Sequence, residues 1–265
     1  MKENIMELTL SMFLIVCPLA FLAGVVDAIG GGGGLISIPA YMLAGLPANV
    51  AVYTNKLSAS FGLVTSTIRY CKNKFIDYHL AVIGIITAAI GAFLGAEFAL
   101  VVDEKIFKIL LLILLPLTAI YVLLKKDLEP KDTQNISRTK QYAIVSIVTL
   151  FVGIYGGFYG PGSGTFLILA YSGFAKMKLL QSEGNAKIID ATIGLCSLAV
   201  FLYNNAVIIP LGLAAAVFST IGSYIGTGMA IKNGNKIIRI VILSVIALLF
   251  IKIMIEAGFK FLELL

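Results

Sequence analysis

Long apolar stretches limit what this chain can fold into more than any other feature. A helix needs about 20 apolar residues to cross the hydrocarbon core of a membrane, which is roughly 30 Å thick. Stretches of about this length occur eight times, at 8–29, 49–70, 78–101, 106–124, 141–160, 184–203, 207–230 and 237–256. Only 13% of the residues are charged, against about a quarter in soluble domains. The sequence therefore predicts an all-α polytopic protein of the cell membrane with about eight transmembrane helices.

The composition also excludes several classes of function. The three cysteines, Cys17, Cys71 and Cys196, are widely separated and form no CxxC motif, so neither a disulfide framework nor a zinc site is indicated. The net charge of +6 is typical of a membrane protein with basic cytoplasmic loops and does not indicate a nucleic-acid partner. The sequence contains no Ser/His/Asp arrangement, nucleotide-binding loop or pair of catalytic carboxylates. We therefore expect no enzyme activity, no cofactor and no metal.

The chain contains an internal repeat. At a shift of 130 or 131 residues the matches include Gly30 with Gly160, Gly32 with Gly162, Gly34 with Gly164, Asn55 with Asn185, and Lys56 with Lys187. So many matches at nearly one shift indicate two transmembrane repeats, 1–124 and 141–265, joined by a polar linker at 125–140. Repeated halves are typical of secondary transporters, whose substrate sites lie where the halves meet.

The relative direction of the two repeats has two possible answers. Four full crossings in each repeat would make them parallel, and we favour this arrangement. The basic segment IKNGNKIIR would then lie outside, against the positive-inside tendency. The apolar pieces 35–46 and 164–175 are too short to cross alone, and if they re-enter the membrane the repeats could be inverted.

Each repeat contains a glycine-rich break in an apolar stretch. The first is GGGGG, which consists of Gly30, Gly31, Gly32, Gly33 and Gly34. The second is GPGSGT, in which Gly160, Gly162 and Gly164 are joined by the hydroxyl residues Ser163 and Thr165. Unpaired backbone groups are costly in lipid, so a break must face protein or a watery cavity. A helix that begins there has free N–H groups, which bind anions, so we assign these residues to a substrate site.

Close helix packing is the alternative use of membrane glycines. We expect it of a second set, which comprises Gly91, Gly95, Gly222, Gly226 and Gly228. For the two breaks we prefer the binding role, because consecutive glycines exceed what close packing requires and because the break occurs twice.

Polar residues follow both breaks at equivalent positions. Asn55 and Lys56 lie in TNK, and Asn185 and Lys187 lie in GNAK. Asparagine donors and a lysine charge together suit an oxyanion, although a lysine near a helix end can instead extend to the lipid headgroups. We assign all four residues to the substrate site.

Carboxylates at membrane depth form a separate group. Asp27 and Asp190 are costly to bury, and each could carry a coupling proton or form an ion pair with a lysine. They are the candidates for binding a coupling ion. Glu97 is a weaker candidate of the same kind, and Glu183 is expected to cap the start of a helix.

The motifs IGGGGGLISIP, TNK, YGPGSGTF and EGNAK together resemble those of the sulfite exporter TauE/SafE family of membrane transporters. The resemblance extends from about residue 12 to 258. It implies a carrier of seven or eight helices for small sulfur-containing anions, such as sulfite or sulfonates, coupled to a cation gradient. It also implies that the glycine breaks, Thr165 and the Asn and Lys residues named above form the site.

These observations favour a secondary transporter that holds a small anion between the two breaks and exposes it to each side in turn. Its expected partners are the anionic substrate, membrane lipid and a coupling proton or sodium ion. The alternative is a carrier or channel for another small ion, such as a cation bound by Asp27 and Asp190. The anion, the direction of transport and the oligomeric state stay open.

Overall fold

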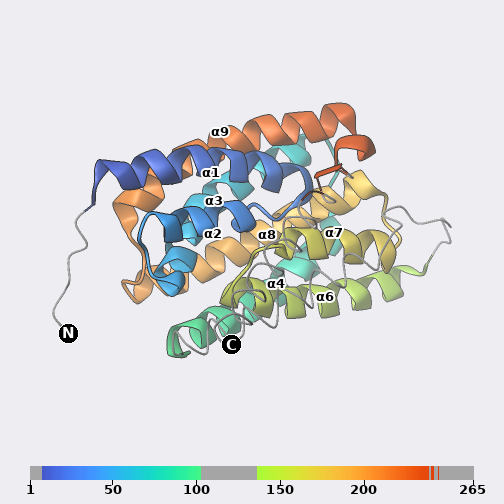
Figure 1. Ribbon diagram of the computed structural model, residues 1–265. Helices are drawn as coiled ribbons and strands as arrows, with labels where there is room; N and C mark the ends of the chain where they lie inside the picture. Colours follow the sequence, from blue (N-terminus) through green and yellow to red (C-terminus); the bar gives the residue numbers. More distant parts are fainter. Residues whose placement is uncertain (1–7, 103–135, 239, 242–243, 245–265) are drawn as a thin grey trace, which may run out of the picture.

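A computed structural model describes residues 8–102, 136–238, 240, 241 and 244, and its regular elements there are all α-helices (Figure 1). They are α1 (Leu10–Gly30), α2 (Gly34–Leu43), α3 (Ala48–Lys72), α4 (Tyr78–Val101), α6 (Arg138–Phe158), α7 (Ser163–Gly173), α8 (Leu179–Tyr203) and α9 (Ile209–Asn233). The predicted span 106–124, and most of the linker 125–140 and of the span 237–256, lie outside the described residues. The prediction of an all-α protein is confirmed for the described part.

Six of the eight predicted spans correspond to long helices. Five of these, α1, α4, α6, α8 and α9, are long and apolar enough to cross a membrane. The sixth, α3, has 25 residues but carries polar side chains, such as those of Thr54, Asn55 and Lys56, that are buried inside the protein. The two short apolar pieces form α2, with 10 residues, and α7, with 11. Helices of this size are only about 15 Å long, so neither crosses the membrane alone.

Glycines bring two pairs of helices into backbone contact. α4 packs along α6, and α1 packs along α9. A Cβ atom added at Gly91 or Gly95 would collide with carbonyl oxygens of α6, and one at Gly222 or Gly226 would collide with carbonyl oxygens of α1. The predicted packing role of these four glycines is confirmed. Main-chain atoms cannot move aside, so a side chain here would push the helices apart.

The described long helices form two sets that run in opposite directions (Figure 1). In the contact between α3 and α8, Ser60 lies against Gly194, whereas Tyr53 packs on Phe201. Residue numbers therefore rise along one helix as they fall along the other. α1 and α9 run with α3, and α4 and α6 run with α8. Since α3 and α8 are equivalent in the sequence repeat, the favoured parallel arrangement of the repeats is wrong for these helices.

The short helices account for this difference. α2 turns back after α1, and α7 turns back after α6 (Figure 1), so the next long helix starts again from the end where the previous one began. The pieces that follow the breaks therefore reverse the chain without completing a crossing. The parallel arrangement assumed that each repeat consists of four full crossings, and a short helix that reverses the chain changes that number.

Basic residues gather at one end of the bundle, which we call the basic end. It holds the C-terminal ends of α3 and α9 and the N-terminal ends of α6 and α8. Its Lys and Arg residues are Arg69, Lys72, Lys74, Arg138, Lys140, Lys176, Lys178, Lys232 and Lys236. The other two basic residues in the described part of the chain, Lys56 and Lys187, are buried. By the positive-inside tendency we expect the basic end to face the cytoplasm.

Asp77 ties three helices together at the basic end. Its carboxylate accepts hydrogen bonds from Arg138 of α6, at 2.7 Å, and from the N–H of Leu80 in α4, at 3.4 Å. Its own N–H donates to Asn185 Oδ1 of α8, at 3.2 Å. Partial burial acts to raise the pKa of the Asp77 carboxyl, but the hydrogen bonds from Arg138 and Leu80 and the charge of Arg138 together hold it below its ordinary value.

Candidate functional site

The two chain breaks lie against each other inside the bundle. Thr165 Oγ1, in the first turn of α7, donates a hydrogen bond of 2.8 Å to the carbonyl oxygen of Gly30 at the end of α1. A Cβ atom on Gly31 would collide with the backbone nitrogen of Thr165, and one on Gly164 would lie 3.2 Å from the Gly31 Cα. Only glycines let the two main chains approach this closely.

Backbone angles also require glycine in both breaks. Gly31 and Gly32 have φ angles of 76° and 83°, and Gly160 and Gly162 have φ angles of 102° and 85°. Residues with a side chain rarely adopt such angles. The two chains can therefore unwind here and restart as α2 and α7, whose first N–H groups have no partner within their own helix.

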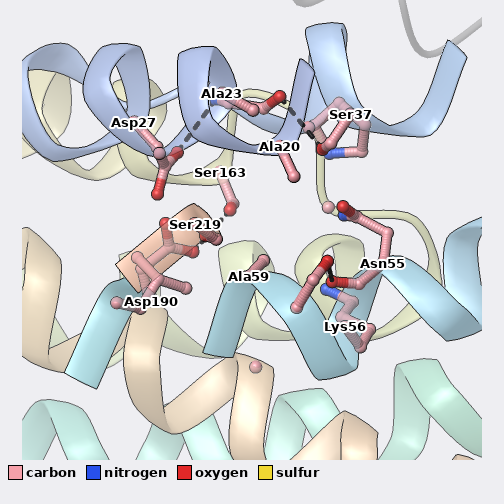
Figure 2. A pocket seen from close by; sticks show the side chains of 18 of the residues that line it. Ala20, Ala23, Asp27, Ser37, Asn55, Lys56, Ala59, Ser163, Asp190 and Ser219 are labelled. Atoms are coloured by element: carbon pink, nitrogen blue, oxygen red, sulfur yellow. Dashed lines mark hydrogen bonds between the residues drawn. The ribbon is translucent and has the colours of Figure 1, made fainter. Parts of the chain in front are cut away.

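A small cavity of about 50 Å³ lies beside this contact. Of the residues assigned to a site from the sequence, it is lined by Asp27, Gly33, Gly34, Asn55, Lys56, Gly160, Gly162, Ser163 and Asp190. They come from α1, α3, α8 and both breaks. In the view of Figure 2, Asp27, Ser163 and Asp190 lie on the left of the cavity, and Asn55 and Lys56 lie on the right.

Two carboxylates of the protein already occupy donors in the breaks. Asp27 Oδ1 accepts a hydrogen bond of 2.9 Å from the N–H of Gly33, and Asp190 Oδ1 accepts one of 2.6 Å from Ser163 Oγ. Both donors had been assigned to the substrate. An anion that enters the cavity must therefore compete with carboxylates that belong to the protein.

Other donors around the cavity are available to a ligand. Gly34, the first residue of α2, lines the cavity, and its N–H has no acceptor among the described residues. Lys56 Nζ donates a hydrogen bond of 2.5 Å to the carbonyl of Gly156, which leaves two of its three N–H donors for other partners. Asn55 is 6% exposed and lines the cavity, and its amide nitrogen carries two N–H donors that a ligand can accept, whereas its Oδ1 is buried without a partner.

Lys187 lies behind the cavity rather than on its surface. Its ammonium donates a hydrogen bond of 2.5 Å to the carbonyl oxygen of Asp27 and lies 3.1 Å from Glu183 Oε1. Both side chains of this ion pair are fully buried. The expectation that Glu183 caps a helix start is therefore wrong, because the carboxylate lies inside α8 and pairs one turn along it.

Several predicted site residues do not line the cavity. The contact between the breaks is formed by Gly30, Gly31, Gly164 and Thr165. Gly32 directly precedes Gly33 and Gly34, which do line the cavity. Lys187 forms the buried ion pair with Glu183. The side chain of Asn185 accepts a hydrogen bond from the N–H of Asp77 and donates one to the carbonyl of Gln181. These bonds hold parts of the basic end together and do not involve the cavity.

The extra residue in GNAK explains why Asn185 does not line the cavity as Asn55 does. Asn55 directly precedes Lys56, whereas Ala186 stands between Asn185 and Lys187. One added residue turns a helix by about 100°, so Asn185 points away from the side where Asn55 lies. The change of the repeat shift from 130 to 131 residues was the signal that could have shown this.

Three serines that line the cavity were missed. Ser37 Oγ donates to the carbonyl of Gly33 at 3.1 Å, and Ser58 Oγ accepts from the Tyr41 hydroxyl at 2.9 Å. Ser37 lies one helical turn after Gly33, and Ser58 lies three residues after Asn55, so helical spacing could have identified both. Ser219 of α9 also lines the cavity, and no sequence pattern indicated it.

Comparisons with known proteins find one family and several relatives that match most of this chain. The family described as sulfite exporter TauE/SafE matches residues 16–253. The probable membrane transporter protein YfcA of Escherichia coli strain K12 is 32% identical over 90% of this chain and 88% of its own. The probable membrane transporter protein ORF9 of Sinorhizobium sp is 32% identical over 85% of this chain and 87% of its own.

A further relative extends the same similarity. A probable membrane transporter protein of Haemophilus influenzae is 30% identical over 90% of this chain and 94% of its own. The comparison with solved structures gave no match. The match over most of the chain shows that this protein belongs to the sulfite exporter TauE/SafE family and is a multi-pass membrane transporter rather than an enzyme.

Proposed function

We propose that this protein moves a small sulfur-containing anion, such as sulfite or an organosulfonate, across the membrane by ion-coupled alternating access. The anion occupies the cavity between the two breaks. The description of the family as sulfite exporters supports this class of substrate. The cavity of about 50 Å³ has room for a small ion, because about 10–15 Å³ of such volume is enough for one water molecule.

The observation that carries the proposal is the set of donors left free around the cavity. The N–H of Gly34 lies at the N-terminal end of α2, where the helix dipole favours a negative charge. Lys56 adds an ammonium, and Asn55 adds the N–H donors of its side-chain amide. An oxyanion with several acceptor atoms can bond to all three groups at once.

The moving parts follow from the direction of the helices. We regard 1–124 and 141–265 as inverted repeats joined by the linker 125–140, and the opposite directions of α3 and α8 support this. In inverted-repeat carriers the site lies between two bodies that rock against each other. Because α1 packs along α9 and α4 along α6, the two bodies here are α1, α2, α3 and α9, and α4, α6, α7 and α8.

Counterflow in proteoliposomes tests this function. Vesicles loaded with unlabelled sulfite should transiently accumulate radiolabelled sulfite from outside, at an initial rate that saturates with concentration. Protein-free vesicles provide the control for passive leakage of sulfurous acid. A channel would give flux without counterflow. If sulfite, sulfate, methanesulfonate and taurine all fail to support counterflow, the proposed anion carrier is wrong.

A cation carrier is the second candidate, because the carboxylates of Asp27 and Asp190 both line the cavity. Carboxylates are preferred ligands of hard cations. Uptake of radiolabelled sodium that needs no anion on either side, together with a lack of sulfite counterflow, would favour this candidate over the anion carrier.

A further inference from the structure

A line of ionisable side chains on α8 leads from the cavity toward the basic end. Asp190 lines the cavity, Lys187 lies three residues before it, and Glu183 lies four residues before Lys187. This spacing places the three side chains on one face of the helix. From Glu183 to Asp190 the line covers about 10 Å along the axis. Asp190 Oδ2 and Lys187 Nζ both lie next to Gly164, within 2.9 Å and 3.5 Å of where its Cβ would be.

Glu183 is the carboxylate of this line that does not line the cavity. Its side chain is fully buried, and the Lys187 ammonium lies 3.1 Å from its Oε1. Among the described residues neither of its carboxylate oxygens accepts a hydrogen bond of good geometry. Buried carboxylates usually accept several hydrogen bonds, so the lone pairs of Glu183 are open to a proton.

The charges around the cavity do not balance. Asp27, Asp190 and Glu183 bring three carboxylates, whereas Lys56 and Lys187 bring two ammonium groups. With all five ionised the cluster carries one net negative charge, and an anionic substrate would raise this to two. Uncompensated charge at membrane depth is costly. One proton bound together with each singly charged anion keeps the net charge of the cluster constant.

We propose that Glu183 is a proton-binding residue through which one proton accompanies each anion and exchanges with the basic end. This inference rests on the proposed anion transport. The proton comes from the water on the side where the anion enters the cavity, and it adds to a carboxylate oxygen of Glu183 to give the neutral acid. It leaves to the solvent at the basic end after the anion has left on that side. The O–H bond is the only bond that forms and breaks.

The first repeat has no corresponding line. The shift of 131 that pairs Lys56 with Lys187 places Val52 opposite Glu183 and Ala59 opposite Asp190. The helix that carries Lys56 therefore has no acid one turn to either side of it on this face. The line of ionisable side chains is therefore present on α8 and not on α3. On α8 it ends at Glu183, one helical turn from Leu179 at the basic end.

Other titratable groups near Glu183 are already committed. The Tyr70 hydroxyl of α3 donates to the Ala28 carbonyl at 3.1 Å. Asp77, before α4, pairs with Arg138 of α6. From α1, Asp27 acts on Glu183 electrostatically, as does Asp190 on the same helix. Lys187 is thus the cation that faces Glu183 directly.

Coupled uptake tests this inference with the Glu183→Gln variant. A pH difference of one unit, acid outside and with the membrane potential clamped, should drive about tenfold accumulation of sulfite by the wild-type protein. Glu183→Gln should keep sulfite counterflow, which needs no net proton movement, but lose this accumulation. Glu97→Gln is the matched control: the sequence made Glu97 a weaker coupling-ion candidate, but its side chain is exposed on α4 and does not line the cavity, so this variant should behave like the wild type. Protein-free vesicles again measure passive leakage.

The outcomes separate the two proposals. A wild-type protein without any anion counterflow overturns the proposed function. Counterflow without pH-driven accumulation overturns only the proton coupling, and full accumulation by Glu183→Gln overturns the role of Glu183. If Glu183→Gln does not fold, the double variant Glu183→Gln/Lys187→Gln removes both partners of the ion pair and leaves the net charge of the cluster unchanged. The same loss of accumulation is expected of it, and retained accumulation would contradict the proposal.

Discussion

Asp27 Oδ1 accepts the N–H of Gly33 at 2.9 Å, so a carboxylate of α1 occupies a donor of the first break. The five-glycine run thus binds an anionic group of the protein before any substrate arrives. A free anion must either use the remaining donors beside it, such as the N–H of Gly34, or displace it. Both routes make the charge of Asp27 a determinant of substrate affinity.

Asp27→Asn should therefore strengthen anion binding. The amide oxygen still accepts the Gly33 N–H, but one negative charge leaves the cavity. At an effective dielectric constant of about 20, removal of a like charge from the wall of the same cavity is worth on the order of 2 kcal/mol, so we expect at least tenfold tighter sulfite binding. Thermal shift titrations of the purified protein with sulfite measure this. Glu97→Gln removes the same charge at an exposed position that does not line the cavity, and it should leave the titration unchanged. Weaker binding by Asp27→Asn would count against an anion site.

Gly222→Ala should destabilise the protein far more than Gly228→Ala, although both positions lie on α9. A Cβ at Gly222 collides with the main-chain carbonyl of Phe21, which cannot move, whereas one at Gly228 meets the guanidinium of Arg69, which can. We expect a loss of about 2–3 kcal/mol at Gly222, as for other overpacked sites, and almost none at Gly228. Thermal unfolding in detergent compares the two, and equal melting temperatures would refute the close contact between α1 and α9.

The sequence was sufficient to predict the breaks and nine of the residues that line the cavity. Consecutive glycines have few uses inside a membrane, and their duplication showed that the two breaks act together. Asn185 was predicted to share a site with Asn55 but does not line the cavity, because equivalence in a repeat describes position along the chain, whereas the lining of a cavity depends on rotation about the helix axis. The inserted residue Ala186 changes the rotation of Asn185 about the helix axis, although it shifts its position along the chain by only one residue.

The direction of the helices and the buried ion pair could not be obtained in the same way. Hydropathy shows that α2 and α7 are too short to cross, but whether they continue forward or turn back depends on tertiary packing. Glu183 lies near the start of α8, where a solvent-exposed cap is the usual role. Its pairing with Lys187 follows from burial of that helical turn by neighbouring helices.

Cysteine accessibility tests the inverted arrangement directly. Asn73 and Asn204 are exposed C-caps of α3 and α8, and they are equivalent at the shift of 131 residues. In a cysteine-free background, Asn204→Cys should react with a membrane-impermeant maleimide added to intact cells. Asn73→Cys, at the basic end, should react only after the cells are permeabilised. Labelling of both positions from the same side would restore the parallel arrangement.

Acidification should weaken the contacts made by Asp77. Because hydrogen bonds hold the pKa of Asp77 below its unfolded value of about 4, its contribution to stability is present above that pH and is lost as the pH falls through the folded-state pKa. Arg138 is 62% exposed, so we expect Asp77→Asn to cost less than about 1 kcal/mol at pH 7. Melting temperatures of both proteins should converge at acid pH; a constant gap would show that the charge of Asp77 is not involved.

The central claim is that the cavity between the two breaks holds the transported anion, and paired asparagine variants test it most directly. Asn55→Leu puts an apolar side chain in the cavity. Asn185→Leu makes the same change at the basic end. It lowers the stability of the protein, because the N–H of Asp77 loses its acceptor. We expect sulfite counterflow, measured per folded molecule in proteoliposomes, to fall by at least about tenfold in Asn55→Leu, since losing a bond to a charged ligand costs about 1.5–3 kcal/mol. Asn185→Leu should stay near the wild-type rate. Undiminished counterflow in Asn55→Leu, or an equal loss in both variants, would contradict this account.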